Sequence, residues 1–157
     1  MELNIAKKLG EQILRKISPY IKRGRLAGSI RRKKPTVRDI DIVIESTSIN
    51  IDKLKNEVSQ LGTLKLKGDK LVRILTPDNI LVDIYIASKE NYEPLLLIRT
   101  GSKEHNIKLT TRAHIFNYKL TANGLIDNKT GKIIATSEKD IFKALKMDYV
   151  EPEKRIW

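Results

Sequence analysis

The sequence contains no cysteine at any of its 157 positions, and only two residues are histidines. Disulfide bonds, thiolate zinc sites and cysteine nucleophiles are therefore excluded together. The absence of cysteine also fits a reducing compartment. We expect an intracellular protein, located in a cytoplasm or encoded by a virus or mobile element, rather than a secreted one.

Long hydrophobic runs are also lacking. The longest purely aliphatic run, residues 95–98, is far too short to cross a bilayer. The first residues, MELNIAKK, carry an acid at position 2 and lack the apolar stretch of a signal peptide. We therefore expect no membrane partner. The 40% of hydrophobic residues can form the core of one domain, or of two very small ones.

Positive charge, in contrast, is abundant. The net charge is +12, and residues 22–38 contain eight basic residues and no acid. Such an excess favours a polyanionic partner, although a solvated loop would show the same run.

The hydrophobic pattern predicts a mixture of helices and strands. Helical spacing occurs in residues 3–17, 50–61, 89–98, the segment up to 116, and 138–146. Strand patterns occur near 26–27, in 39–45, in three segments between 63 and 87, and in short segments between 118 and 135. The sequence therefore predicts an α+β fold.

Two aspartates lie on one face of the strand predicted at 39–45. Side chains alternate between the faces of a strand, so Asp39 and Asp41 share one face and the intervening isoleucines share the other. With a rise of about 3.3 Å per residue, the two aspartate Cα atoms are about 6.5–7 Å apart. An Asp-x-Asp pair on a strand is most often a solvent-facing edge, but this spacing also suits carboxylates that converge on divalent cations.

A third acid has the same arrangement. In LVDIYIA, Asp83 lies opposite a β-branched face. If the two strands pair in one sheet, Asp39, Asp41 and Asp83 come together, and three such carboxylates repel one another unless cations lie among them. Hard oxygen ligands without histidine or cysteine favour Mg²⁺ or Mn²⁺.

A candidate phosphate site precedes these acids. Gly28 lets backbone N–H groups approach a phosphate, Ser29 adds a hydroxyl donor, and Arg31 and Arg32 supply positive charge. Phosphate donors, cations and paired carboxylates within eighteen residues are the components of metal-assisted nucleotidyl transfer.

These residues resemble a known family. Gly28-Ser29, then Arg31-Arg32, then Asp39-x-Asp41 ten residues after the serine resemble the signature of family X DNA polymerases, the relatives of polymerase beta. TGSKEHN at 100–106 resembles the motif at the entry to the family's thumb, and RAHIFNYKLTANGL and IFKALKMDYVEPEKR resemble the segments that follow it. The first signature alone is shared with many nucleotidyltransferases.

The resemblance implies a role for each motif residue. Asp39 and Asp41 would bind both of two Mg²⁺ or Mn²⁺ ions, and Asp83 would bind the catalytic ion and help to activate the primer 3′-hydroxyl. The implied nucleotide contacts are Gly28, Ser29, Arg32, Gly101, Ser102 and Asn106. Ser102 is equally compatible with a plain helix cap. The implied DNA contacts are Lys33, Lys34, Lys103, Lys108 and Arg112.

The resemblance also implies an architecture and an activity. We expect a nucleotidyltransferase palm at 1–95 and a small α+β thumb at 96–157, with no lyase activity because only 27 residues precede Gly28. The expected protein is a monomeric DNA-directed DNA polymerase that uses dNTPs to fill short gaps in DNA repair. The alternatives are a small nucleotidyltransferase that modifies a protein or RNA, and a nucleic-acid-binding module with a decayed site.

The sequence departs from the family's pattern at three positions. Ile98 and Arg99 stand where many members have two aromatic residues, and Thr110 stands where many carry an arginine. We therefore expect modest fidelity and relaxed sugar selection, because discrimination depends on contacts that differ between substrates.

Overall fold

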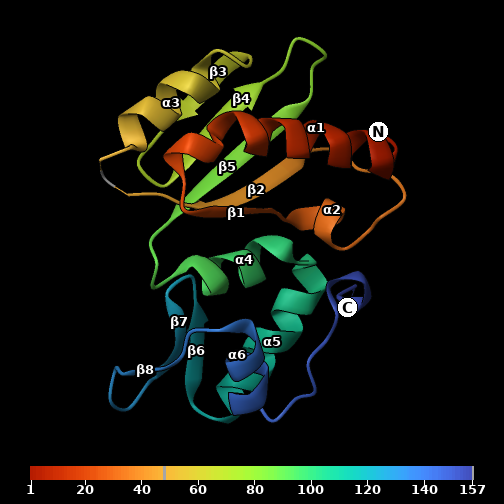
Figure 1. Cartoon of the computed structure of the whole chain (residues 1–157). Helices are drawn as coiled ribbons and strands as arrows, with labels where there is room; N and C mark the ends of the chain where they lie inside the picture. Colours follow the sequence, from red (N-terminus) through yellow and green to blue (C-terminus); the bar gives the residue numbers. More distant parts are fainter. Residues whose placement is uncertain (48, 157) are drawn as a thin grey trace.

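The computed structural model describes residues 1–47 and 49–156, which form two groups of elements, one above the other in Figure 1. Helices α1 to α6 span Leu3–Ile17, Gly28–Arg31, Ile51–Ser59, Tyr92–Thr100, Lys103–Ile115 and Glu138–Ala144. Strands β1 to β8 span Arg23–Leu26, Ile40–Glu45, Thr63–Lys67, Leu71–Leu75, Leu81–Ala87, Tyr118–Thr121, Gly124–Asp127 and Ile133–Ala135. The predicted α+β class is confirmed.

The first sheet has five strands in the order β1-β2-β5-β4-β3. Strands β2 and β5 are parallel, and the other neighbours are antiparallel. The sheet is therefore mixed, with the two acid-bearing strands at its centre.

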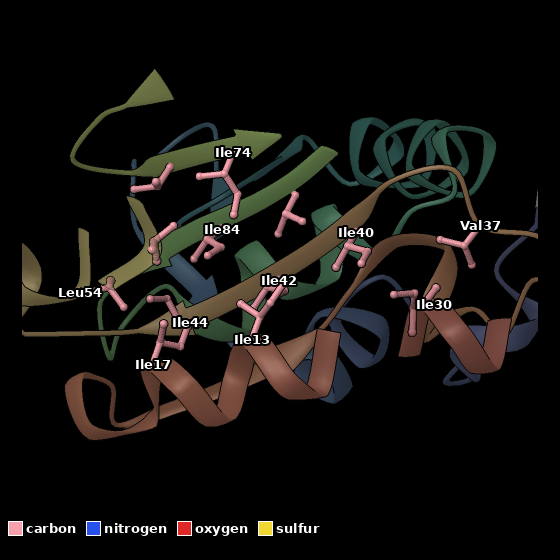
Figure 2. Packing of buried hydrophobic residues seen from close by; sticks show 14 residues of the cluster. Ile13, Ile17, Ile30, Val37, Ile40, Ile42, Ile44, Leu54, Ile74 and Ile84 are labelled. Atoms are coloured by element: carbon pink, nitrogen blue, oxygen red, sulfur yellow. The ribbon is translucent and has the colours of Figure 1, made fainter. Parts of the chain in front are cut away.

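One face of this sheet is covered by α1 and α3. Figure 2 shows Ile42 and Ile44 of β2 beside Ile13 and Ile17 of α1, and all four side chains are buried. Each buried isoleucine stabilises the fold by about 1.5–3 kcal/mol relative to an exposed one. The alternation predicted from the sequence is thus what fixes the faces of β2, because a shift of one residue would expose all of its isoleucines.

The opposite face of the sheet is partly covered by α4. Val43 of β2 and Tyr85 of β5 pack against Tyr92, Leu95 and Leu96 of this helix. The acids lie on the same face, two residues earlier in each strand. The helix therefore closes one end of this face and leaves the acids at the other end.

The second group of elements consists of α4, α5, α6 and the three-stranded sheet β6-β7-β8. Its core is formed by buried side chains that include Leu97, Leu109, Leu125 and Phe142. Helix α6 begins after Ser137, whose hydroxyl accepts a hydrogen bond from the backbone N–H of Asp140 at 3.1 Å. This cap begins the helix that the sequence predicts at 138–146.

A buried charge network joins the two groups of elements. Arg31 of α2 donates two hydrogen bonds to Glu138 of α6, at 2.8 and 2.7 Å, and Arg155 donates a third at 2.8 Å. Burial alone would raise the pKa of Glu138, but the hydrogen bonds and charges of Arg31 and Arg155 hold it below the ordinary value. We call these three residues the buried clamp.

The element boundaries differ from the sequence prediction at two places near the acids. Strand β2 begins at Ile40, so Asp39 lies just before the strand and is exposed. Residues 28–31 form the short helix α2, which the sequence pattern did not indicate because it is only four residues long. Within the described residues no helix is long and apolar enough to span a membrane.

The buried clamp yields a stability prediction. Glu138→Gln removes the carboxylate that neutralises two buried guanidinium groups, so we expect a loss of about 3–5 kcal/mol in the free energy of unfolding. Urea denaturation measures it. The matched control is Glu153→Gln, since Glu153 makes an exposed ion pair with Lys33 at 3.8 Å, and we expect at most about 1 kcal/mol there. A similar effect of both variants would contradict a clamping role.

Candidate active site

The pairing of β2 with β5 places two carboxylates side by side. In this parallel pair, Asp41 is the register partner of Asp83. Both side chains lie on the face opposite the isoleucine core, as the sequence pattern predicts. Asp39 precedes β2 at the same end, and its charge acts on Asp41.

The pKa of Asp41 reflects its closeness to the other two carboxylates. The pKa of Asp41 is raised to about 6, chiefly by burial and then by the negative charges of Asp83 and Asp39, against the lowering effects of Arg99 and Arg32. Gly28 contributes to the burial. A Cβ atom on Gly28 would lie 2.3 Å from the Asp41 carboxylate, and the residue has a positive φ of 55°. Only glycine fits this close approach.

Asp83 has a partner that the sequence analysis missed. Arg73 of β4 is its register partner and donates two hydrogen bonds to its two carboxylate oxygens, at 2.6 and 3.1 Å. The Tyr85 hydroxyl also lies 3.5 Å from one of these oxygens. Both oxygens of Asp83 are therefore occupied by a guanidinium.

The three carboxylates are of the chemical type that binds divalent cations, but in the described residues they are not arranged as a metal site. Three carboxylates without histidine or cysteine are ligands that Mg²⁺ and Mn²⁺ prefer. Among the described residues, however, no three acidic or histidine side chains are already disposed to hold a metal ion. The assignment of Asp39, Asp41 and Asp83 as metal ligands therefore stays a prediction, and in this structure Asp83 is held by Arg73.

A cleft of about 270 Å³ opens beside the acids. Its lining contains the candidate phosphate contacts, Ser29 and Arg32, and the acids Asp39 and Asp41. Arg32 crosses the cleft and donates a hydrogen bond to the Thr100 carbonyl at 2.6 Å. Burial lowers the pKa of Arg32, which remains a cation at neutral pH.

Arg31 does not line this cleft. Its guanidinium donates to Glu138 in the buried clamp and to the Thr100 hydroxyl at 2.8 Å. The structure therefore does not support the role in phosphate neutralisation that the position of Arg31 beside Arg32 suggested. Arg31 instead fixes α2, which carries Ser29 and Arg32, against the second group of elements.

The segment TGSKEHN forms the turn from α4 into α5. Gly101 has a φ of +69°, and its Cα faces the Arg32 guanidinium. The Ser102 hydroxyl accepts a hydrogen bond from the backbone N–H of His105 at 3.2 Å, so Ser102 is the N-cap of α5. The Asn106 side chain donates to the Ile98 carbonyl at 2.9 Å.

The chain is similar to known DNA polymerases in sequence and in fold. The family model for the DNA polymerase beta thumb matches residues 95–156. The DNA polymerase/3′-5′ exonuclease PolX of Bacillus subtilis is 28% identical over 159 aligned positions, which cover 98% of this chain. The crystal structure of Leishmania infantum polymerase beta in a ternary P/T complex superposes with a TM-score of 0.82 at 17% identity, covering 99% of this chain and 76% of that one.

The chain is similar to family X DNA polymerases: residues 95–156 match the polymerase beta thumb, and the whole chain has the fold of polymerase beta. It spans 27% of the length of the Bacillus PolX protein. The likeness to the Leishmania structure concerns the fold, and it includes both groups of elements. The family X resemblance expected from the sequence motifs is thus confirmed.

The candidate DNA contacts of this family X-like chain fall into two sets. Lys34, Lys103 and Lys108 are exposed, and Lys33 is exposed with its ammonium 3.8 Å from Glu153. Arg112 is different, because its guanidinium donates to the Leu145 and Lys146 carbonyls at the end of α6, at 2.9 and 3.4 Å. Its donors are already used within the fold.

Two arginines near the acids were absent from the sequence-predicted site. Arg73 could have been found, since the alternation in KLVRILT places it opposite Val72 and Ile74, as Asp83 lies opposite its own apolar neighbours. Arg99 of α4 lines the cleft, and its guanidinium lies 4.3 Å from the centre of the Tyr85 ring. Its position depends on the packing of α4, which no local pattern reveals.

His105, next to the candidate nucleotide contact Asn106, gives the site a pH-dependent stability. His105 is 1% exposed and packs against the Phe142 ring, with 5.9 Å between the two ring centres. Neither nitrogen of its ring has a hydrogen-bond partner among the described residues. Burial, followed by the charges of Arg155 and Lys108, lowers its pKa from 6.5 to about 4.

The folded state therefore keeps His105 neutral at pH values where the unfolded chain binds a proton. The stability that the neutral ring contributes is present above pH 6.5 and is lost as the pH falls toward 4, by up to about 3 kcal/mol. His105→Phe should flatten this loss when urea denaturation is measured from pH 7 to 4.5. His114→Phe is the control, because His114 is exposed. An equal fall of the free energy of unfolding with pH in wild type and His105→Phe would contradict the role given to His105.

Proposed function

We propose that the chain is a DNA-directed DNA polymerase of family X, which adds nucleotides to a primer 3′-hydroxyl and fills short gaps in DNA repair. The observation that carries the proposal is the in-register pair Asp41 and Asp83, of which Asp41 lines a cleft together with Ser29 and Arg32. In the reaction, the 3′-oxygen forms a bond to the α-phosphorus of a dNTP as the bond to the leaving pyrophosphate breaks.

Two divalent cations, Mg²⁺ or Mn²⁺, would be held by Asp39, Asp41 and Asp83 and would supply charge neutralisation at the reacting phosphate. Asp83 would also stand nearest the primer end and help to remove the 3′-hydroxyl proton. The positions of Asp41 and Asp83 at the end of the sheet face that α4 leaves uncovered support these roles. Asp39 belongs to the same set because its charge acts on Asp41.

The nucleotide would lie in the cleft between the two groups of elements. Ser29 and Arg32 would hold its triphosphate, near Gly28 where the backbone has no side chain in the way. Gly101 and Asn106 would contact its sugar and base, and Ser102 would fix the turn as the cap of α5. Asn106 is suited to this contact because its side-chain oxygen has no partner within the described residues.

We divide the chain into a palm at residues 1–95 and a thumb at 96–157, of which Trp157 lies outside the described residues. The match of the thumb family model to residues 95–156 supports this boundary. The exposed lysines Lys33, Lys34, Lys103 and Lys108 would bind the DNA backbone. Affinity for DNA would then fall as the salt concentration rises.

The activity is tested by primer extension on gapped, nicked and template-free DNA with Mg²⁺. We expect extension on gapped DNA, and we expect Asp41→Asn and Asp83→Asn each to lower its rate by about a thousandfold or more, since each removes a metal ligand. Asp69→Asn is the matched control, because its side chain is 98% exposed and, in the part of the chain that the structure describes, pairs with Lys55 alone.

The outcomes separate the candidate functions. Extension that requires a template supports the polymerase. Template-free addition to RNA or to a protein, with the same dependence on Asp41 and Asp83, would replace it with a nucleotidyltransferase of another substrate class. Near wild-type extension by Asp83→Asn would show that the acids are not the reacting centre.

A further inference from the structure

Arg73 is a cation built into the acidic face of the sheet. It lies on β4, next to Asp83 on β5, in an antiparallel register that points both side chains to the same face. Its guanidinium donates to both oxygens of Asp83, in the fork geometry that gives the strongest arginine–carboxylate pairs.

The pair is asymmetric in its exposure. The Asp83 side chain is 10% exposed, whereas that of Arg73 is 39% exposed. The guanidinium therefore closes over the carboxylate from the solvent side and can leave without opening the core. The buried clamp differs in this respect, because Arg155 in that network is 0% exposed.

A second arginine flanks the acids from the other group of elements. Arg99 of α4 lies over the Tyr85 ring and lines the cleft together with Asp41. Arg73 and Arg99 thus approach the acidic pair from two different elements. Of these two arginines, Arg73 alone is hydrogen-bonded to an acid of the pair within the described residues.

We propose that Arg73 is a resident counter-cation that positions Asp83 before metal binds and must release at least one of its oxygens when a divalent cation enters. This inference rests on the proposed function, because it assumes that Asp83 is a metal ligand. Mg²⁺ and Mn²⁺ bind through carboxylate oxygens. A guanidinium fork on both oxygens competes for the same lone pairs and adds a like charge beside the incoming ion.

The consequence is a metal affinity that is lower than the acids alone would give. Before metal arrives, Arg73 offsets the repulsion between Asp83 and Asp41 and keeps the carboxylate aimed at its neighbour. Arg73 is therefore a positioning residue, and its effect is on the ion rather than on the reacting atoms.

The test measures Mn²⁺ binding to the free protein by electron paramagnetic resonance of unbound Mn²⁺, without DNA or nucleotide. Arg73→Met keeps much of the side chain but removes the charge and the fork, and we expect about tenfold tighter binding. Arg73→Lys keeps the charge but loses the fork, and we expect an intermediate gain of about threefold. Far-UV circular dichroism verifies that each variant is folded.

Arg23→Met is the matched control. Arg23 donates to Glu45 at 2.8 Å, and the two side chains are 46% and 7% exposed, so this pair resembles Arg73 and Asp83 in distance and burial. Glu45 lies on β2 at the end far from Asp41, in register with Ala87. We expect unchanged Mn²⁺ affinity for this variant.

Binding by Arg73→Met that equals or is weaker than that of wild type would overturn the inference. A gain for Arg73→Met with wild-type affinity for Arg73→Lys would overturn the competition for lone pairs and leave a charge effect alone. Asp83→Asn distinguishes the two levels of the argument. If it leaves Mn²⁺ binding unchanged, or if wild type binds no Mn²⁺, the proposed metal site itself fails. If it weakens binding while Arg73→Met changes nothing, only the role of Arg73 fails.

Discussion

The parallel, in-register pairing of β2 and β5 is the constraint on which the rest of the site depends. The buried isoleucines of β2 and the matching face of β5 fix which way each strand faces. Asp41 must then lie beside Asp83 on the other face, whatever the cost of bringing two carboxylates together. Hydrophobic burial of several side chains, at about 1.5–3 kcal/mol each, is large enough to hold this arrangement against their repulsion.

The chain compensates its buried carboxylates with arginines in two ways, according to how deeply each charge is buried. In the clamp, Glu138 is matched by two arginines that stay within the fold, which joins the two groups of elements. At the site, Arg73 holds Asp83 from the solvent side, and Asp41 is left with a raised pKa that the nearby charges of Arg99 and Arg32 only partly offset. The site is therefore incomplete in charge, and an added cation would complete it.

Much of the fold and part of the site could be predicted from the sequence, because they depend on local pattern. The period-two alternation around Asp41 and Asp83 predicts both strands and their faces, whereas their pairing was assumed and is seen in the structure. The sequence could not predict that Arg31 pairs with Glu138 while Arg32 lines the cleft. The pairing depends on Glu138, which is 107 positions away from Arg31 in the sequence. The ion pair between Arg73 and Asp83 likewise could not be predicted, because it depends on the strand order that places β4 beside β5.

The central claim is that Asp41 and Asp83 form an acidic pair that binds a divalent cation. Thermal unfolding with and without Mn²⁺ tests it most directly, on wild type, Asp41→Asn and the exposed control Asp69→Asn. Wild type and the control should gain stability with Mn²⁺, by about 2.7 kcal/mol at a hundredfold excess over Kd. Asp41→Asn should melt higher than wild type without metal and gain little from Mn²⁺. An equal gain for all three proteins, or a lower melting temperature for metal-free Asp41→Asn, would contradict the account.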